Sequence, residues 1–340
     1  MFERRRLGAT NLAVSLLGFG GIPIMRISTA GARDVVQAAL EEGIDFFDTA
    51  RGYADSEQKI GKALRELGAR PVLASKSPKR DKQGMLEDVA ASLAALGVDS
   101  IDLYQLHCVS DREAFDQVLG PGGACEALRE LRAEGRVRHV GITTHNLDIA
   151  RLAIECAEFE TIQILFNVIE DRALAEVIPS ALKADMGVIA MKPFGGGVID
   201  QWEIALRWVL STGGIVAIPG VASVSEVREN AAIARTPRPL RRRELEGIAA
   251  IKASLGPRFC RRCDYCQPCP NGVPISMLLQ VDAIRKRLGE PALRAPSWQD
   301  VLKKAVDCDQ CGTCEPRCPF ELPIRELVKQ ARENLIQILD

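Results

Sequence analysis

The 340-residue chain has almost no net charge, few aromatic residues and only three histidines. Because 44 lysine and arginine residues balance 45 aspartate and glutamate residues, charge gives no basis for binding nucleic acid or a membrane surface. The chain also lacks an apolar run near the ~20 residues that a membrane-spanning helix needs, and its basic N-terminus lacks the apolar stretch of a signal peptide. These absences predict a cytoplasmic protein with no nucleic-acid or membrane partner.

Cysteine, by contrast, is abundant, and eight of the eleven cysteines lie in two short stretches. The stretches CRRCDYCQPCP and CDQCGTCEPRCP contain Cys260, Cys263, Cys266 and Cys269, and Cys308, Cys311, Cys314 and Cys318. In a reducing compartment such groups are metal or redox sites rather than disulfides. The other three, Cys108, Cys125 and Cys156, lie in apolar surroundings and are expected to be inert, and the sequence supplies Cys108 with no obvious base.

The spacing of the second stretch, CxxCxxCxxxCP, is that of bacterial ferredoxins. In that pattern three cysteines bind one [4Fe–4S] cluster and the fourth binds the other cluster. Crossing of this kind predicts that Cys318 completes the cluster of the first stretch and Cys269 the cluster of the second. The first stretch has one residue fewer before its last cysteine, and two zinc sites with four cysteines each are the alternative.

The preceding part of the chain alternates short apolar runs with segments of helical periodicity. The runs are Ser15–Gly21, Ile44–Ala50, Pro71–Lys76, Ser100–Cys108, Val137–His145, Glu160–Asn167, Met186–Phe194 and Gly214–Gly220. Eight strand–helix units predict an α/β fold, a (β/α)8 TIM barrel. A doubly wound sheet is the alternative, but the glycines of the first run do not have GxGxxG spacing.

Three parts are therefore expected: a barrel over residues 1–237, a linker and helix over 238–258, and a small helical ferredoxin-like iron–sulfur module over 259–340. Within the module, Ser276–Leu288 and Trp298–Val306 are expected to be helical. A closing amphipathic helix in Leu322–Leu339 is expected to pack its apolar face onto the protein.

Polar residues stand at successive strand ends, where barrel enzymes hold their active sites. Asp48, Lys76 and His107 end the second, third and fourth predicted strands, and Tyr53 lies in the loop after Asp48. A phenol has a pKa of ~10, and a nearby ammonium lowers that pKa toward the range useful for proton donation. With Asp48 orienting Lys76 and His107 hydrogen-bonding a carbonyl oxygen, the set predicts reduction of an aldehyde or ketone by a nicotinamide hydride.

Several segments are similar, in the same order, to the aldo-keto reductase family: FFDTARGYADSEQKIGKAL, VLASK, IDLYQLH, GRVRHVGITTHN and ALRWVLSTGGIVAIPGVASVSEVREN. The resemblance implies a barrel that binds NAD(P)H without a Rossmann domain, with Asp48, Tyr53, Lys76 and His107 as the catalytic tetrad. The segment CDYCQPCPNGVPI resembles the branch of that family with a fused ferredoxin-like 4Fe–4S domain, which implies two [4Fe–4S] clusters.

The resemblance also implies the cofactor contacts. They are Gly21, Thr143, Thr144, Gln163, Lys192, Gly220, Ser223, Glu226, Glu229 and Asn230. Thr143 and Thr144 replace the family's Ser-Asn pair, and Lys192 in KPFGGG suits the pyrophosphate. Gly220 and Glu226 stand where basic residues commonly hold the 2′-phosphate of NADP, which favours NADH.

Three functions are compatible with these features. The barrel could be a reductase of a small carbonyl or alcohol substrate with structural clusters. The clusters could instead pass electrons to a ferredoxin-like carrier, or the protein could sense nicotinamide or oxygen. The intact tetrad favours an enzyme.

Overall fold

The computed structural model describes residues 2–236, 238–262 and 264–339, which divide into two compact units. The first unit comprises residues 1–193 and 205–240, and the second comprises residues 194–204 and 241–340. The predicted boundary at Pro237 lies outside the described residues, as does Cys263.

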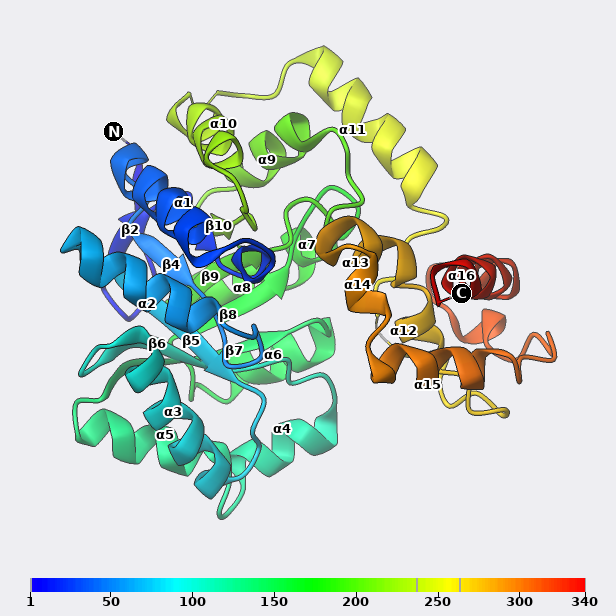
Figure 1. The fold of residues 1–340 in the computed structure, drawn as a ribbon, viewed down its shortest axis with the longest axis horizontal. Coiled ribbons are helices and arrows are strands. Elements are labelled where there is room, and N and C mark those ends of the chain that lie inside the picture. The colour runs from blue at the N-terminus through cyan, green and yellow to red at the C-terminus, as the bar shows by residue number, and fades with distance from the viewer. Residues whose placement is uncertain (1, 237, 263, 340) are drawn as a thin grey trace. The chain divides into compact units, whose positions relative to one another are not determined.

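The first unit is a barrel of eight parallel strands (Figure 1). The strands are β3 (Phe19–Gly20), β4 (Phe46–Asp48), β5 (Val72–Ser77), β6 (Ile101–Leu106), β7 (Val137–Thr144), β8 (Thr161–Leu165), β9 (Gly187–Met191) and β10 (Ile215–Ile218). They pair in chain order, and parallel bridges from Leu17 to Ala217 and from Gly20 to Gly220 join the first strand to the last. The predicted (β/α)8 barrel is confirmed, and each of the eight predicted runs overlaps one barrel strand.

Helices surround the strands (Figure 1). They are α1 (Thr29–Glu42), α2 (Ser56–Leu67), α3 (Lys82–Leu96), α4 (Arg112–Leu119), α5 (Ala124–Ala133), α6 (Leu147–Glu155), α7 (Ala173–Glu176), α8 (Ile178–Lys183), α9 (Trp202–Leu210) and α10 (Val224–Arg235), with the short 3-10 helix η1 at Pro23–Arg26. Local chemistry sets their ends: the side chain of Asp81 accepts a hydrogen bond from the backbone of Gly84 at the start of α3. Gly97 ends that helix in the left-handed conformation, with φ 69°.

The first strand prediction needs one correction. Ser15 belongs to an antiparallel hairpin of β1 (Arg4–Arg6) and β2 (Ala13–Ser15), and only Phe19–Gly20 enters the barrel. The hairpin contributes Leu7 and Val14 to an apolar cluster with Phe46, Leu103 and Ile189 from the barrel strands. The hairpin is therefore packed onto the barrel core, and the strand ends that carry the polar residues remain for chemistry.

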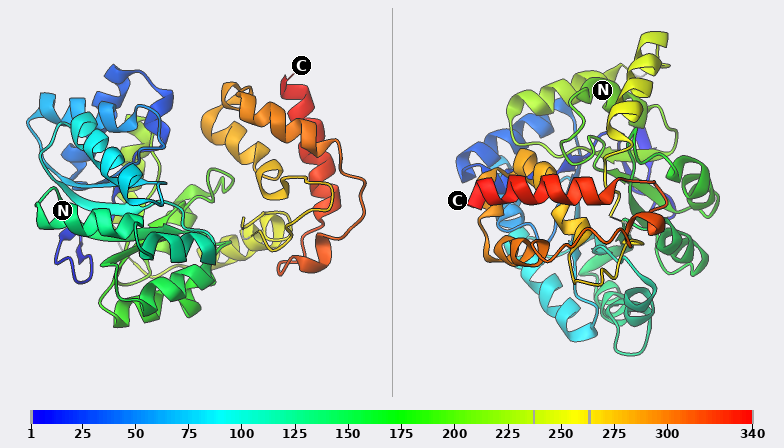
Figure 2. Two further views of the ribbon diagram at one scale, coloured as in Figure 1. Left: turned by 90° about the horizontal axis from the view of Figure 1, so that it is seen from below. Right: turned by 90° about the vertical axis from the view of Figure 1, so that its right-hand side faces the viewer.

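The second unit is helical. Besides a 3-10 turn, η2 (Glu315–Arg317), its elements are α11 (Arg242–Leu255), α12 (Ile275–Leu278), α13 (Val281–Leu288), α14 (Glu290–Leu293), α15 (Pro296–Ala305) and α16 (Ile324–Leu339). The expected helix Ser276–Leu288 is divided into α12 and α13, and the expected linker helix α11 groups with this unit. The closing helix α16 packs against α13 and α15 (Figure 2).

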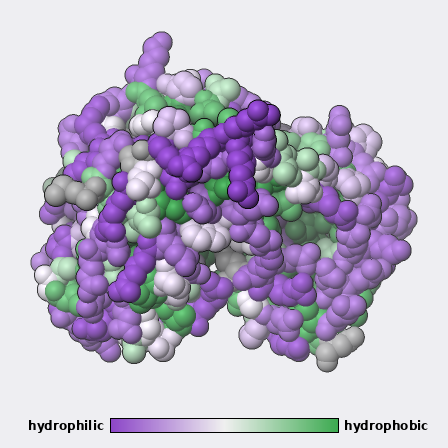
Figure 3. Space-filling view, turned by 90° about the horizontal axis from the view of Figure 1, so that it is seen from above, coloured by the Kyte–Doolittle hydropathy of each residue, from purple (hydrophilic) through white to green (hydrophobic). Residues whose placement is uncertain are grey.

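The core of this unit is small and contains cysteine. The buried face of α16 supplies Ile324, Val328 and Leu335, which lie with Val273 and Leu278 in one apolar cluster. Cys266 is part of that cluster, and several other cysteines pack against it. Apolar side chains are scattered over a mainly hydrophilic surface on the face seen in Figure 3. None of the helices in the described part of the chain has the length and apolarity that a bilayer crossing requires.

Candidate active site

A buried ion pair lies at the ends of two neighbouring strands. Lys76 of β5 donates from Nζ to Oδ1 of Asp48, the last residue of β4, over 2.6 Å, and both side chains are at most 3% exposed. The same ammonium donates to the backbone oxygen of Thr49 over 2.8 Å. The side-chain amide of Gln105 in β6 donates to Oδ2 of Asp48 over 3.3 Å. Both charges are thus compensated inside the barrel.

The charge of Lys76 is maintained by its partners. Burial by itself lowers the pKa of the Lys76 ammonium, but the Asp48 carboxylate and Tyr53 outweigh that effect, and the pKa of Lys76 is raised above its usual value. Lys76 is therefore a fixed positive charge at the strand ends.

Tyr53 and His107 complete the group. The Lys76 ammonium is 5.1 Å from the centre of the Tyr53 ring, and the Tyr53 and His107 rings meet edge to face with centres 5.7 Å apart. The loop that carries Tyr53 is held by backbone hydrogen bonds, from Tyr53 to Ala50 over 3.0 Å and from Ser56 to Tyr53 over 2.8 Å. The structure therefore brings together all four tetrad residues identified from the sequence.

His107 is held in its neutral form. Burial lowers the pKa of the His107 imidazole to about 3, and the positive charges of Lys76, Arg80 and Lys192 act in the same direction. A neutral imidazole carries one N–H donor and one acceptor nitrogen. Near neutral pH this ring can donate a hydrogen bond without carrying a charge.

Two positioning residues were missed by the sequence analysis. Glu57 is 1% exposed, accepts a hydrogen bond from Ser75 Oγ over 2.6 Å and forms an ion pair with Arg51, two residues before Tyr53. Gln105 lies two residues before His107 and contacts Asp48. Side chains alternate between the two faces of a strand, so Gln105 lies on the same face as Leu103. This alternation could have identified Gln105 as an inward-facing residue. For Glu57 no sequence signal pointed to burial.

The candidate nicotinamide contacts lie at the end of β7, where Thr143 and Thr144 stand, and in the middle of β8, where Gln163 pairs with Thr143. Thr143, Thr144 and Gln163 are each 1% exposed. Thr143 Oγ1 accepts from the backbone of Cys108 over 2.7 Å, and Thr144 Oγ1 accepts from the backbone of Asn146 over 3.0 Å. Gln163 Oε1 is a buried acceptor that no hydrogen-bond donor reaches within the described residues.

The candidate adenosine end surrounds the start of α10. Ser223 Oγ accepts from the backbone of Glu226 over 3.2 Å, and the Glu226 carboxylate accepts from the backbone of Ala222 over 2.6 Å. Asn230 is buried, whereas Glu229 is exposed. Gly21 and Gly220 lie in close contact with neighbouring backbone or proline atoms, so a side chain would not fit at either position.

Arg26 of η1 was not identified from the sequence. Burial lowers the pKa of the Arg26 guanidinium, while the charge of Glu226 opposes that shift. Arg26 is thus a further cation that interacts with Glu226, and the preference for NADH stays a prediction.

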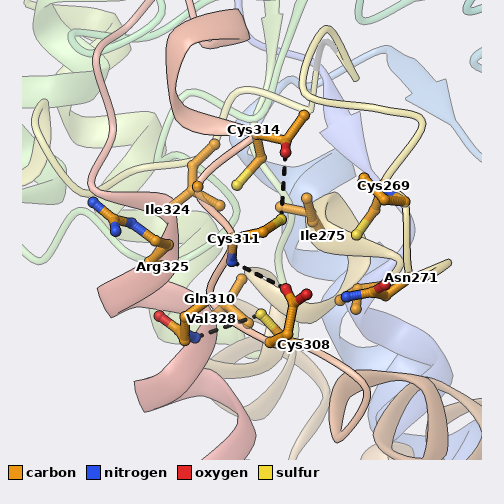
Figure 4. Close-up of a pocket in the computed structure, with 15 residues that line it drawn as sticks. Cys269, Asn271, Ile275, Cys308, Gln310, Cys311, Cys314, Ile324, Arg325 and Val328 are labelled. Carbon is orange, nitrogen blue, oxygen red and sulfur yellow. Dashed lines mark hydrogen bonds between the residues drawn. The ribbon is translucent and has the colours of Figure 1, made fainter.

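The cysteines of the second unit line two pockets. Cys269, Cys308, Cys311 and Cys314 line one of them (Figure 4). Cys260, Cys266 and Cys318 line the other. The last cysteine of each stretch thus lies with the first three positions of the other stretch, as far as these are described. None of the ten described cysteines is disulfide-bonded.

The pockets do not have the form of single-ion sites. Within the described ranges, no three His, Cys, Asp or Glu side chains are close enough together to hold one metal ion. The four thiolates of a [4Fe–4S] cube bind four different iron atoms, so they enclose a volume rather than converge on a point. Cysteines that line a pocket would suit that donor arrangement, and the choice between iron–sulfur clusters and zinc stays a prediction.

A closed parallel barrel with a buried Asp–Lys pair, a tyrosine and a neutral histidine at its strand ends has the architecture of a barrel oxidoreductase. Residues 16–204 match the aldo/keto reductase family. The chain is 27% identical to L-galactose dehydrogenase from Arabidopsis thaliana over 282 residues, 68% of this chain and 87% of that protein. The chain belongs to the aldo/keto reductase family and is an NAD(P)H-dependent oxidoreductase.

Two solved structures resemble this chain over about three quarters of its length. The holo form of an aldo-keto reductase from Bacillus halodurans aligns with a TM-score of 0.64 at 25% identity, covering 74% of this chain and 96% of that chain. An aldo-keto reductase from Klebsiella pneumoniae in complex with NADPH aligns with a TM-score of 0.62 at 25% identity, covering 74% and 95%. The alignments cover nearly the whole of both relatives, whereas a substantial part of this chain lies outside them.

Proposed function

We propose that the barrel reduces an aldehyde or ketone with NAD(P)H and that Tyr53 is the proton donor. The observation that carries this proposal is the grouping of Tyr53 with the buried Lys76 ammonium, 5.1 Å from the ring centre, and with the neutral His107. Family membership supports it, because the relatives include reductases of small carbonyl compounds.

The chain's own residues would act on the carbonyl oxygen. When bound, the nicotinamide supplies the hydride that the carbonyl carbon accepts. Tyr53 gives its phenolic proton to the oxygen, and the Lys76 ammonium stabilises the phenolate that remains. Asp48 fixes the position of Lys76 through the 2.6 Å contact. His107 donates a hydrogen bond to the same oxygen, which orients the substrate.

The barrel residues fit a nicotinamide cofactor. The buried Gln163 Oε1 can accept a hydrogen bond from the carboxamide N–H2. Lys192 would face the pyrophosphate, and Ser223 and Asn230 the adenosine phosphate. Arg26 near Glu226 offers a cation for a 2′-phosphate, so the proposal includes both NADH and NADPH.

Replacing Tyr53 by phenylalanine tests the assignment. Tyr53→Phe should lower carbonyl turnover by about 10²- to 10⁴-fold while cofactor binding, followed by nicotinamide fluorescence, stays nearly unchanged. Tyr265→Phe is the matched control, because Tyr265 is exposed in the second unit, and it should keep turnover. Equal turnover of Tyr53→Phe and the wild type would refute the mechanism.

We further infer that the second unit binds two [4Fe–4S] clusters. Cys260, Cys263, Cys266 and Cys318 would hold one, and Cys269, Cys308, Cys311 and Cys314 the other. The sorting of the described cysteines into two pockets supports this assignment, as does the affinity of thiolates for iron–sulfur clusters. Such clusters would supply single-electron transfer when bound.

A redox relay to a ferredoxin-like carrier is the second candidate function. It is favoured by the exposure of Cys311, because a carrier must approach a cluster closely to exchange an electron with it. Anaerobic purification with iron and sulfide analysis tests for the clusters. Adding NADH and NADPH separately, then a carbonyl, while following visible and EPR spectra tests the relay. Reduction of clusters that a carbonyl reverses supports the relay, whereas turnover with silent clusters leaves them a structural role.

A further inference from the structure

A second group of reactive side chains lies at the strand ends beside the tetrad. Cys108 follows His107 directly, and its sulfur lies 3.9 Å from Nδ1 of His145 and 3.4 Å from Oγ of Ser110. His145 follows β7, 37 residues away in sequence, so the imidazole beside Cys108 comes from a distant part of the chain. Cysteine and histidine are brought together here by the barrel topology.

The neighbours of His145 determine which of its nitrogens carries the proton. Lys192 Nζ lies 3.3 Å from His145 Nε2. An ammonium can only donate, so Nε2 is the acceptor and the neutral ring carries its proton on Nδ1, the nitrogen that faces the Cys108 sulfur. His145 is therefore a hydrogen-bond donor to this sulfur rather than its base.

Further positive charge surrounds Cys108. Arg80 donates to the backbone oxygens of His107 and Cys108, each over 2.9 Å. The carboxylate of Asp111 attracts the guanidinium of Arg80 electrostatically. The sulfur of Cys108 is partly exposed, so an electrophile can reach it, and the thiolate is the nucleophilic form of cysteine.

The backbone holds this group in an uncommon conformation. Cys108 and Lys192 both have φ of 55°, in the left-handed region that side chains with a Cβ rarely occupy. Such conformations persist where the surrounding structure fixes them. The thiol of Cys108 and the ammonium of Lys192 contact opposite nitrogens of the His145 ring.

The other two barrel cysteines have the opposite environment. Cys125 is buried, and burial raises the pKa of its thiol to about 12. Burial also raises the pKa of Cys156, whose sulfur donates to the backbone oxygen of Ala153. These two thiols provide an internal reference for the reactivity of Cys108.

We propose that Cys108 is a covalent modification site for α,β-unsaturated carbonyl compounds. The thiolate sulfur forms a bond to the β carbon, the carbon–carbon double bond shifts its electron pair to give the enolate, and the α carbon then takes a proton from water. No oxidant or reductant is needed. Because Cys108 adjoins His107, the adduct occupies the carbonyl site and stops turnover, a consequence that rests on the proposed function.

The proposal is tested with N-ethylmaleimide, an α,β-unsaturated dicarbonyl. The full-length protein, with its clusters, is treated at limiting reagent, and the alkylation rates of Cys108, Cys125 and Cys156 are measured separately by peptide mass spectrometry. Cys108 should react about 100-fold faster than either reference thiol. Alkylation of Cys108 no faster than of Cys156 would overturn the proposal.

A pair of histidine variants tests the role of His145. His145→Phe should slow Cys108 alkylation about tenfold, while His139→Phe, which removes the histidine paired with Glu160 instead, should leave the rate unchanged. Slow labelling of Cys125 in both variants shows that the barrel remains folded. An unchanged Cys108 rate in a folded His145→Phe protein would overturn the role of His145.

The turnover consequence is measured last. Alkylated wild-type protein should lose turnover, and Cys108→Ala should keep it under the same treatment. Turnover that survives full labelling of Cys108 would overturn the blockade. Absence of turnover in the unmodified protein would instead refute the proposed function, and the labelling rates would still decide the modification site.

Discussion

The barrel site and the cysteine pockets differ in how their polar side chains are partnered. In the barrel, Asp48 and Lys76 neutralise each other over 2.6 Å, and neighbouring strands supply their remaining partners. In the second unit, the cysteines line pockets without converging on any single point within the described residues. In the barrel, the partners of both charges are residues of the chain, whereas the partners of the pocket cysteines would be the proposed clusters.

Breaking the ion pair should have the largest effect. Lys76→Met leaves the Asp48 carboxylate buried without its cation, which should cost about 3–5 kcal/mol of unfolding free energy and abolish most turnover. Denaturant unfolding and steady-state kinetics measure the two effects. The double variant Asp48→Asn with Lys76→Met should recover stability but not turnover. A double variant no more stable than Lys76→Met would contradict the pairing.

Removing a cluster ligand should affect the second unit alone. Cys311→Ser should lower bound iron and sulfide and loosen α15 and α16, because the cysteines proposed to bind the same cluster, Cys269, Cys308 and Cys314, pack against the small core of that unit. The barrel should keep its unfolding transition, since the described apolar cluster of Leu7, Phe46 and Ile189 contains only residues of the barrel unit. Calorimetry with limited proteolysis measures both, and Cys156→Ser in the barrel is the matched control. Loss of the barrel transition as well would show that the units fold as one.

The sequence predicted the features that follow a repeating pattern. Eight apolar runs indicated eight strands, and polar residues at strand ends indicated Asp48, Lys76 and His107. The first hairpin was missed because Arg4–Arg6 shows no apolar alternation, yet Arg5 is buried and donates to the backbone oxygen of Ile215 over 2.5 Å. A charged side chain whose partners are distant backbone oxygens leaves no local signal.

Residues whose role depends on long-range contacts were also missed. Ser75 lies 18 residues from Glu57, Gln105 lies 57 residues from Asp48, and His145 lies 37 residues from Cys108. Only the closure of the barrel brings these side chains together. The sorting of cysteines into two pockets was predictable because ferredoxin spacing encodes it.

The neutral state of His107 should make the barrel acid-sensitive. The pKa of His107 is about 3 in the folded protein against 6.5 as the usual value, so between these values the unfolded chain binds a proton that the folded protein does not. Stability from this group is complete above pH ~6.5 and declines as the pH falls toward 3. Between pH 7.5 and 5, wild type should lose about 2 kcal/mol more than His107→Gln. Equal losses in denaturant titrations would contradict the assignment.

The smallest expected effect is on the reduction potential of one proposed cluster, and it comes from removing hydrogen bonds to the cysteines of a single pocket. Gln310 Nε2 donates to Cys308 Sγ over 3.4 Å, and Thr313 Oγ1 lies 3.4 Å from Cys311 Sγ (Figure 4). A cluster-bound thiolate can only accept, so both side chains would donate to ligand sulfurs of the second cluster. Hydrogen bonds to these sulfurs stabilise the extra negative charge of the reduced cluster and raise its potential.

Gln310→Leu and Thr313→Val should therefore each lower the potential of one cluster and leave the other unchanged. The shift should be below tenfold in the one-electron equilibrium, which corresponds to about 59 mV. EPR-monitored redox titration measures it, and Gln299→Leu on the exposed surface of α15 is the matched control. If both clusters shifted together, the side chains would be acting through the fold of the whole unit. A shift confined to one cluster would show that the second unit, like the barrel, tunes its chemistry with individual hydrogen bonds.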